Sequence, residues 1–83
     1  MNVVELKIDQ IVIPRGRRLD KEDPAFRELV ADVETYGVQQ PISVKHYVDK
    51  KGNDRYTLVD GLRRLSAARE AGIASLVCDI LRK

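Results

Sequence analysis

The chain has 83 residues, of which 43% are hydrophobic and 34% charged, and its formal net charge at pH 7 is +2. This length allows one small domain over residues 1–83, while the composition excludes a disordered chain and the longest apolar runs are too short to span a bilayer. One cysteine cannot form an internal disulfide, and with the one histidine it provides too few ligands for a zinc site.

The first residues alternate between charged and apolar side chains. This period of two predicts a half-buried strand that begins at Val3 and continues to Ile13, where Pro14 ends it. The same alternation lacks the apolar core of a signal peptide, so we expect a cytoplasmic protein. Residues 14–23 combine proline, glycine and many charges, which predicts an exposed loop.

A first helix is predicted after this loop. Asp23 is expected as its N-cap and Pro24 as its first residue, and Gly37 is expected to end it. The apolar positions between them follow the i, i+3, i+4, i+7 spacing of an amphipathic helix. They are Phe26, Leu29, Val30 and Val33.

Two strands, a second helix and a final strand complete the predicted elements. Residues 42–48 and 56–59 alternate as strands, and the turn residues at 52–54 join them into an antiparallel hairpin. Residues 62–71 have helical spacing, and the segment from 75 onward is typical of a buried strand. The sequence therefore predicts an α+β domain, a small mixed sheet of about four strands with two main helices.

The start of the second helix is the main candidate site. Its free amides and dipole attract anions, and Gly61 would let a phosphate approach the backbone closely. Arg63 and Arg64 oppose the dipole in the first turn, and a phosphate held between amides and a guanidinium would account for them. The alternative is a pair of solvated arginines offset by Asp60 and Glu70. Asp60 is predicted to cap the helix rather than to act as a catalytic carboxylate beside the phosphates.

Other residues add to this picture. Arg15, Arg17 and Arg18 form a second basic cluster in the loop before the first helix, and a small sheet could bring that loop beside the second helix. Cys78 has no basic neighbour in sequence and is predicted to be a small buried hydrophobe. His46 is predicted to be a hydrogen-bonded structural histidine.

Three segments in this order resemble the N-terminal domain of ParB-type partition proteins, a ParB-like nuclease domain of the ParB/sulfiredoxin superfamily. They are IDQIVIPRGRR, YGVQQPISV and LVDGLRRLSAAREAG. The residues that match family motifs are Gly37, Gln40, Pro41, Ile42 and Val44 in the second segment, and Gly61, Arg63, Arg64 and Ala67 in the third.

The resemblance implies a ParB/sulfiredoxin-like fold that binds nucleotide phosphates at the start of the second helix, with CTP in partition proteins and ATP or ADP in some relatives. It implies a pocket formed by Gly61, Arg63, Arg64, Arg15, Arg17, Arg18, Gln39 and Gln40. We therefore expect CTP or another nucleotide as ligand, with or without Mg²⁺, in a protein of DNA partition or DNA-linked regulation. DNA would be reached through a partner or a longer parent chain, and a homodimer is compatible with the family.

Leu62 departs from the family pattern. Partition proteins usually have a glutamate between the glycine and the arginine pair, and sulfiredoxins have their catalytic cysteine at that position. Leucine there makes nucleotide hydrolysis doubtful and does not support sulfiredoxin chemistry. A binding module is therefore preferred over the alternative, a small ParB-like enzyme acting as a nucleotidase, kinase or nuclease.

Overall fold

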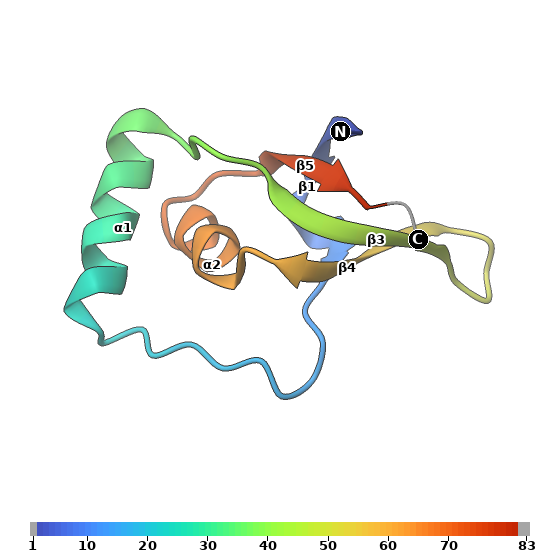
Figure 1. Cartoon of the computed structure of the whole chain (residues 1–83), viewed down its shortest axis with the longest axis horizontal. Coiled ribbons are helices and arrows are strands. Elements are labelled where there is room, and N and C mark those ends of the chain that lie inside the picture. The colour runs from blue at the N-terminus through green and yellow to red at the C-terminus, as the bar shows by residue number, and fades with distance from the viewer. Residues whose placement is uncertain (1, 82–83) are drawn as a thin grey trace.

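The computed structural model describes residues 2–81. It has one five-stranded mixed sheet and two α-helices, so the predicted α+β class is confirmed (Figure 1). The elements in chain order are β1 (Val3–Lys7), the 3₁₀ helix η1 (Ile8–Gln10), β2 (Ile11–Val12), α1 (Pro24–Tyr36), β3 (Ile42–Val48), β4 (Asp54–Asp60), α2 (Leu62–Glu70) and β5 (Ser75–Ile80). The strand order in the sheet is β1-β5-β3-β4-β2. No helix within residues 2–81 is both long and apolar enough to cross a membrane.

The first predicted strand is two strands. The turn η1 follows Lys7, so β1 and β2 lie at opposite edges of the sheet, β1 antiparallel to β5 and β2 parallel to β4. Ile8, the first residue of η1, and Ile11, the first residue of β2, are both buried. The alternation with period two breaks at this turn, where Gln10 stands two positions after Ile8, and the sheet gains a fifth strand beyond the four or so predicted.

The remaining elements follow their local sequence signals. Asp23 caps α1 by accepting a hydrogen bond from the amide of Ala25 at 3.0 Å, and Gly37 ends the helix with a φ of 75°. β3 and β4 form the predicted antiparallel hairpin. Near the turn that joins these strands, Nε2 of His46 lies 2.9 Å from Oδ1 of Asp54, so this histidine is hydrogen-bonded although exposed.

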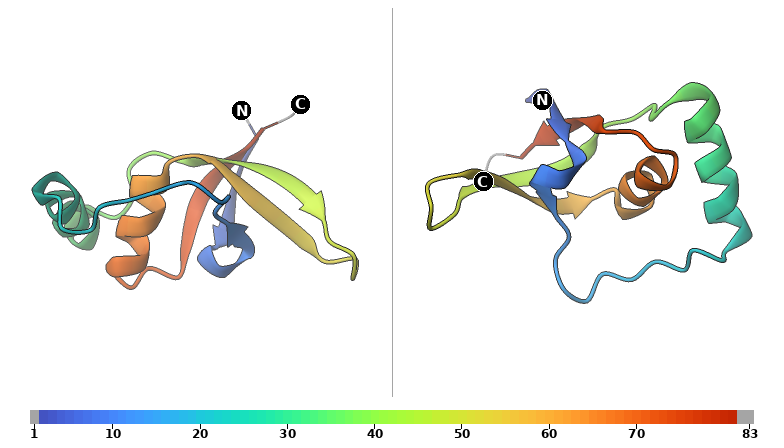
Figure 2. Two further views of the ribbon diagram at one scale, coloured as in Figure 1. Left: turned by 90° about the horizontal axis from the view of Figure 1, so that it is seen from below. Right: turned by 180° about the vertical axis from the view of Figure 1, so that it is seen from behind.

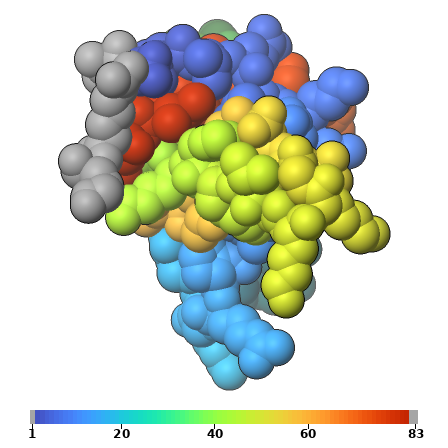
Figure 3. Space-filling view, turned by 90° about the vertical axis from the view of Figure 1, so that its right-hand side faces the viewer, coloured from blue at the N-terminus to red at the C-terminus, as the bar shows by residue number. Residues whose placement is uncertain are grey.

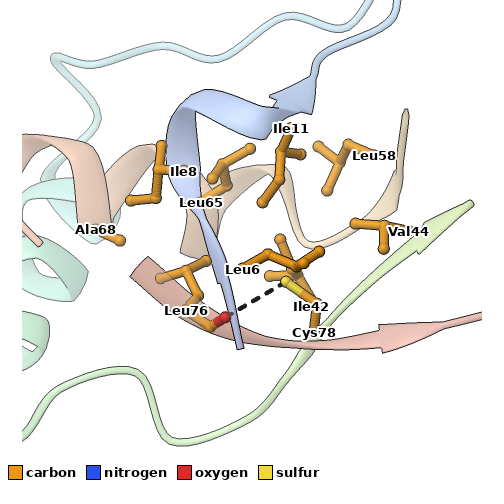
Figure 4. Close-up of a cluster of buried hydrophobic side chains, with 10 residues drawn as sticks. All are labelled: Leu6, Ile8, Ile11, Ile42, Val44, Leu58, Leu65, Ala68, Leu76 and Cys78. Carbon is orange, nitrogen blue, oxygen red and sulfur yellow. Dashed lines mark hydrogen bonds between the residues drawn. The ribbon is translucent and has the colours of Figure 1, made fainter. Parts of the chain in front are cut away.

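Helix α2 is the central element of the domain because it packs on both the sheet and α1. Between α2 and the sheet lies the larger group of buried side chains, which includes Ile42, Leu65 and Cys78 (Figure 4). On the other side of α2, Ala67 packs against Phe26 and its neighbours on α1. Figure 1 looks roughly along the axis of α2, with α1 and the sheet on either side of it.

The loop from β2 to α1 completes the surroundings of α2. It runs from the edge of the sheet, past α2, to the start of α1 (Figure 2). In the space-filling view it projects away from the sheet, which leaves its charged side chains open to solvent (Figure 3). The sheet, α1 and this loop thus surround one helix.

Candidate functional site

The N-terminus of α2 follows directly after β4. Gly61 is its N-cap, with φ of 108° in the left-handed region, and the helix has no side-chain cap and no acidic residue in its first turn. Asp60, which we predicted as the cap, is instead the last residue of β4. The partial positive charge of the helix dipole is therefore reinforced by Arg63 and Arg64 rather than neutralised, and an anion is the ligand that this end favours.

Gly61 is also required by the packing of the fold. A Cβ at this position would lie 2.6 Å from Cγ2 and 2.9 Å from Cβ of Ile42, a fully buried residue of β3. The sequence suggested that this glycine serves the approach of an anion. The structure gives it a second reason, because β3 and the start of α2 touch there.

The two arginines of the first turn leave the helix in different directions. Arg63 reaches the start of α1, where its Nη1 and Nη2 lie 3.4 and 3.5 Å from Oδ2 of Asp23. Arg64 reaches the start of β3, where its Nη1 donates to the carbonyl oxygen of Pro41 at 2.7 Å and more weakly to that of Gln40 at 3.4 Å. Arg64 thus connects α2 to the start of β3, whereas the contact that Arg63 makes within residues 2–81 is long and exposed to solvent.

The loop before α1 does come beside the start of α2, as the sequence suggested. Arg17 donates from Nη1 to the carbonyl oxygen of Val59 at 3.2 Å, two residues before Gly61. Arg15 and Arg18 are exposed on the same loop. Of the three loop arginines, Arg17 therefore has the contact that brings it to the candidate site.

A groove of about 380 Å³ lies between this loop and α2, and sequence reasoning missed part of its lining. Its cationic residues are Arg17, Lys21 and Arg69, and Leu62 and Ser66 line its α2 side. Residues 62, 66 and 69 have the spacing of one helix face, so the position of Arg69 in this lining could have been predicted from the sequence. Lys21 could not, because its place depends on the path of the loop.

Glu70 neutralises one side of this groove. Its carboxylate lies 3.3 Å from Nζ of Lys21 and 3.5 Å from Nη1 of Arg27. The hydrogen bond from Lys21, with the nearby charges, holds the pKa of Glu70 below its usual value. Glu70 therefore offsets Lys21 and Arg27, and not the arginine pair that it would offset in the alternative interpretation.

Gln39 and Gln40 lie on the other side of the arginine pair. They line a hollow of about 470 Å³ together with Arg64 and the C-terminal half of α1. Nε2 of Gln39 donates to the carbonyl oxygen of Tyr36 at 2.8 Å and so closes the end of α1. The side chain of Gln40 is exposed. Arg17 thus lies on one side of the start of α2, and Gln39 and Gln40 lie on the other side beside Arg64. No contact brings Arg15 or Arg18 to this place among the described residues.

Comparison with known proteins identifies the family of this chain. The family described as the ParB N-terminal domain matches residues 1–82. The chain belongs to the ParB N-terminal domain family. The probable chromosome-partitioning protein ParB of Mycobacterium leprae is 40% identical to it over 53 residues, and that of Vibrio cholerae is 34% identical over 61 residues. These matches cover 64% and 74% of this chain but 16% and 20% of the relatives, so the chain spans about a fifth of their length.

The backbone of this ParB N-terminal domain is similar to that of several solved structures. ParB from Caulobacter crescentus complexed with CTP-gamma-S matches all of this chain and 46% of its own, with a TM-score of 0.81 and 26% identity. Sulfiredoxin from Arabidopsis thaliana matches 98% of this chain and 85% of its own, with a TM-score of 0.75 and 29% identity. The predicted ParB/sulfiredoxin-like fold is therefore confirmed.

Proposed function

We propose that this ParB N-terminal domain binds a nucleotide, with CTP as the first candidate, through phosphates held at the N-terminus of α2. One observation carries the proposal: an uncapped helix start lies beside Arg63 and Arg17 in a backbone that matches, over its whole length, a ParB complexed with CTP-gamma-S. Helix amides bind phosphate oxygens, and a guanidinium donates two parallel hydrogen bonds to them.

The contacts of the arginines support different roles for them. Arg63 is proposed as the main phosphate ligand because its exposed contact with Asp23 can be exchanged at little cost. Arg17 would approach from the loop side, with Arg15 and Arg18 adding charge further out. Arg64 keeps free N–H groups besides the one that donates to Pro41, so it can touch a phosphate while positioning the helix.

The net charge of the chain favours a limited role of this domain in DNA contact. The net charge of +2 is low for a domain that coats DNA by itself. ParB from Caulobacter crescentus has been solved with the centromeric parS site, and this chain covers 40% of that chain. We therefore propose that DNA is reached through a partner or through other segments of a longer chain.

Titration calorimetry with CTP, ATP and GTP, each with and without Mg²⁺, tests the proposed function. We expect saturable binding that is tightest for CTP, and weaker competition by inorganic pyrophosphate. If none of these ligands binds at millimolar concentration, the arginine pair serves only the fold and the surface.

A leucine at position 62 leads to a prediction about turnover. Leu62 lines the loop-side groove beside Arg17 and Arg69, where the family resemblance places a glutamate. Without that carboxylate, phosphate release from CTP should be undetectable or very slow, and Leu62→Glu should increase it. Leu62→Gln should not increase phosphate release, because glutamine has the shape of glutamate without its charge. Robust phosphate release by the unaltered domain would contradict this prediction.

The similarity to sulfiredoxin favours a second candidate, a thiol-dependent enzyme, and the position of the cysteine argues against it. Cys78 is the only cysteine of the chain, and it is fully buried in β5 with Sγ 3.6 Å from the carbonyl oxygen of Leu76 (Figure 4). Burial raises the pKa of the Cys78 thiol to about 11. The reactive thiolate is therefore scarce at neutral pH and inaccessible to a substrate.

Iodoacetamide should confirm that Cys78 is inert. A thiol with a pKa of about 11 is ionised to about one part in a thousand at pH 8. We expect labelling of the native domain to be at least about 100-fold slower than labelling in denaturant, and Cys78→Ala to bind CTP as the original does. Fast labelling of the folded domain, measured by mass spectrometry, would contradict the structural role of this cysteine.

A further inference from the structure

We propose that the carboxylate of Asp23 competes with phosphate for Arg63, so that a nucleotide binds by displacing an anion of the domain itself. This inference rests on the proposed function and adds a residue that sets its affinity. Its starting point is the contact between the N-cap of α1 and the first turn of α2.

Asp23 divides its two oxygens between two elements. Oδ1 accepts the amide of Ala25 at 3.0 Å and caps α1, while Oδ2 faces Arg63. The two terminal guanidinium nitrogens, Nη1 and Nη2, lie near that one oxygen, at 3.4 and 3.5 Å. Strong guanidinium pairs are bidentate, with separations of about 2.7–2.9 Å. The contact with Asp23 therefore leaves most of the binding capacity of Arg63 unused.

A phosphate can do what Asp23 cannot. It presents two oxygens to the guanidinium and can also reach the uncapped amides of α2, whereas Asp23 is tied to α1 through Oδ1. The side chains of Arg63 and Asp23 are 47% and 37% exposed, so a ligand can enter between them. Displacement frees only Oδ2, and the cap on α1 stays in place.

Asp23→Asn isolates the competition because asparagine caps a helix as well as aspartate does. We expect the variant to bind CTP and inorganic pyrophosphate about two- to fivefold more tightly, the range expected when an exposed ion pair no longer competes. Its thermal melt should match that of the original. Asp20→Asn is the matched control, since it removes the same charge from the same loop and its Oδ1 accepts the amide of Glu22.

A double-mutant cycle tests whether the effect passes through Arg63. In an Arg63→Ala background, titrated at higher ligand concentrations, Asp23→Asn should no longer tighten binding. The inference is overturned if the gain persists in that background, if Asp20→Asn gives the same gain, or if Asp23→Asn weakens binding. If neither the unaltered domain nor Asp23→Asn binds CTP or pyrophosphate, the proposed function fails as well.

Discussion

Gly61→Ala should destabilise the domain by about 2–5 kcal/mol, the largest stability effect that we expect from a change at the candidate site. Two costs combine at this position. An alanine would be strained at φ of 108°, and its Cβ would overlap Ile42, whose Cγ2 lies only 2.6 Å away in a fully packed part of the core. Denaturant unfolding followed by circular dichroism measures the sum.

Gly72→Ala separates the two costs. Gly72 also has a positive φ, 78°, but a Cβ there would meet no atom within 4 Å. We expect this variant to lose about 1–2 kcal/mol from backbone strain alone. If Gly61→Ala is no less stable than Gly72→Ala, the contact with Ile42 does not constrain the start of α2.

Arg63→Ala should weaken CTP binding by about ten- to a hundredfold. A hydrogen bond to a charged group contributes about 1.5–3 kcal/mol, which corresponds to that range of affinity. The melting temperature should hardly change, because the contact with Asp23 is exposed and long. Arg63→Lys should restore only part of the affinity, since it keeps the charge but loses the planar fork.

Arg64→Ala is the control for Arg63→Ala, because Arg64 also has a structural contact. It removes the 2.7 Å hydrogen bond to Pro41, so we expect it to lower stability by about 1–3 kcal/mol as well as affinity. Calorimetry and thermal melts on both variants separate a ligand contact from a structural one. If Arg63→Ala binds CTP as tightly as the original domain, Arg63 is an ordinary surface charge.

The fold could be predicted from sequence wherever the signal is local. Asp23 followed by Pro24 marks the start of α1, and alternating apolar residues mark the β3–β4 hairpin. The turn η1 was missed although the sequence carries a sign of it, because Ile8 and Ile11 are three positions apart and so break the period of two. What separates β1 from β2 is pairing with β5 and β4, which lie far away in sequence.

The candidate site could be predicted in outline but not in its contacts. Neighbouring residues on a helix point about 100° apart, so Arg63 and Arg64 could not both face one ligand in the same way. Which groups they meet depends on the packing of α1 and β3 around α2. The close approach of Gly61 to Ile42 could not be predicted, because it is a tertiary contact between residues that are far apart in the sequence.

The tie between Arg64 and Pro41 has a consequence for how related sequences diverge. Gly61 and Arg64 serve the scaffold itself, so a related domain without the proposed nucleotide binding would still be selected to keep both. Arg63 would be free to drift in such a lineage, because its present partner is an exposed carboxylate. Among homologues, loss of the first arginine beside a retained glycine and second arginine should therefore mark domains that kept the fold after losing the ligand.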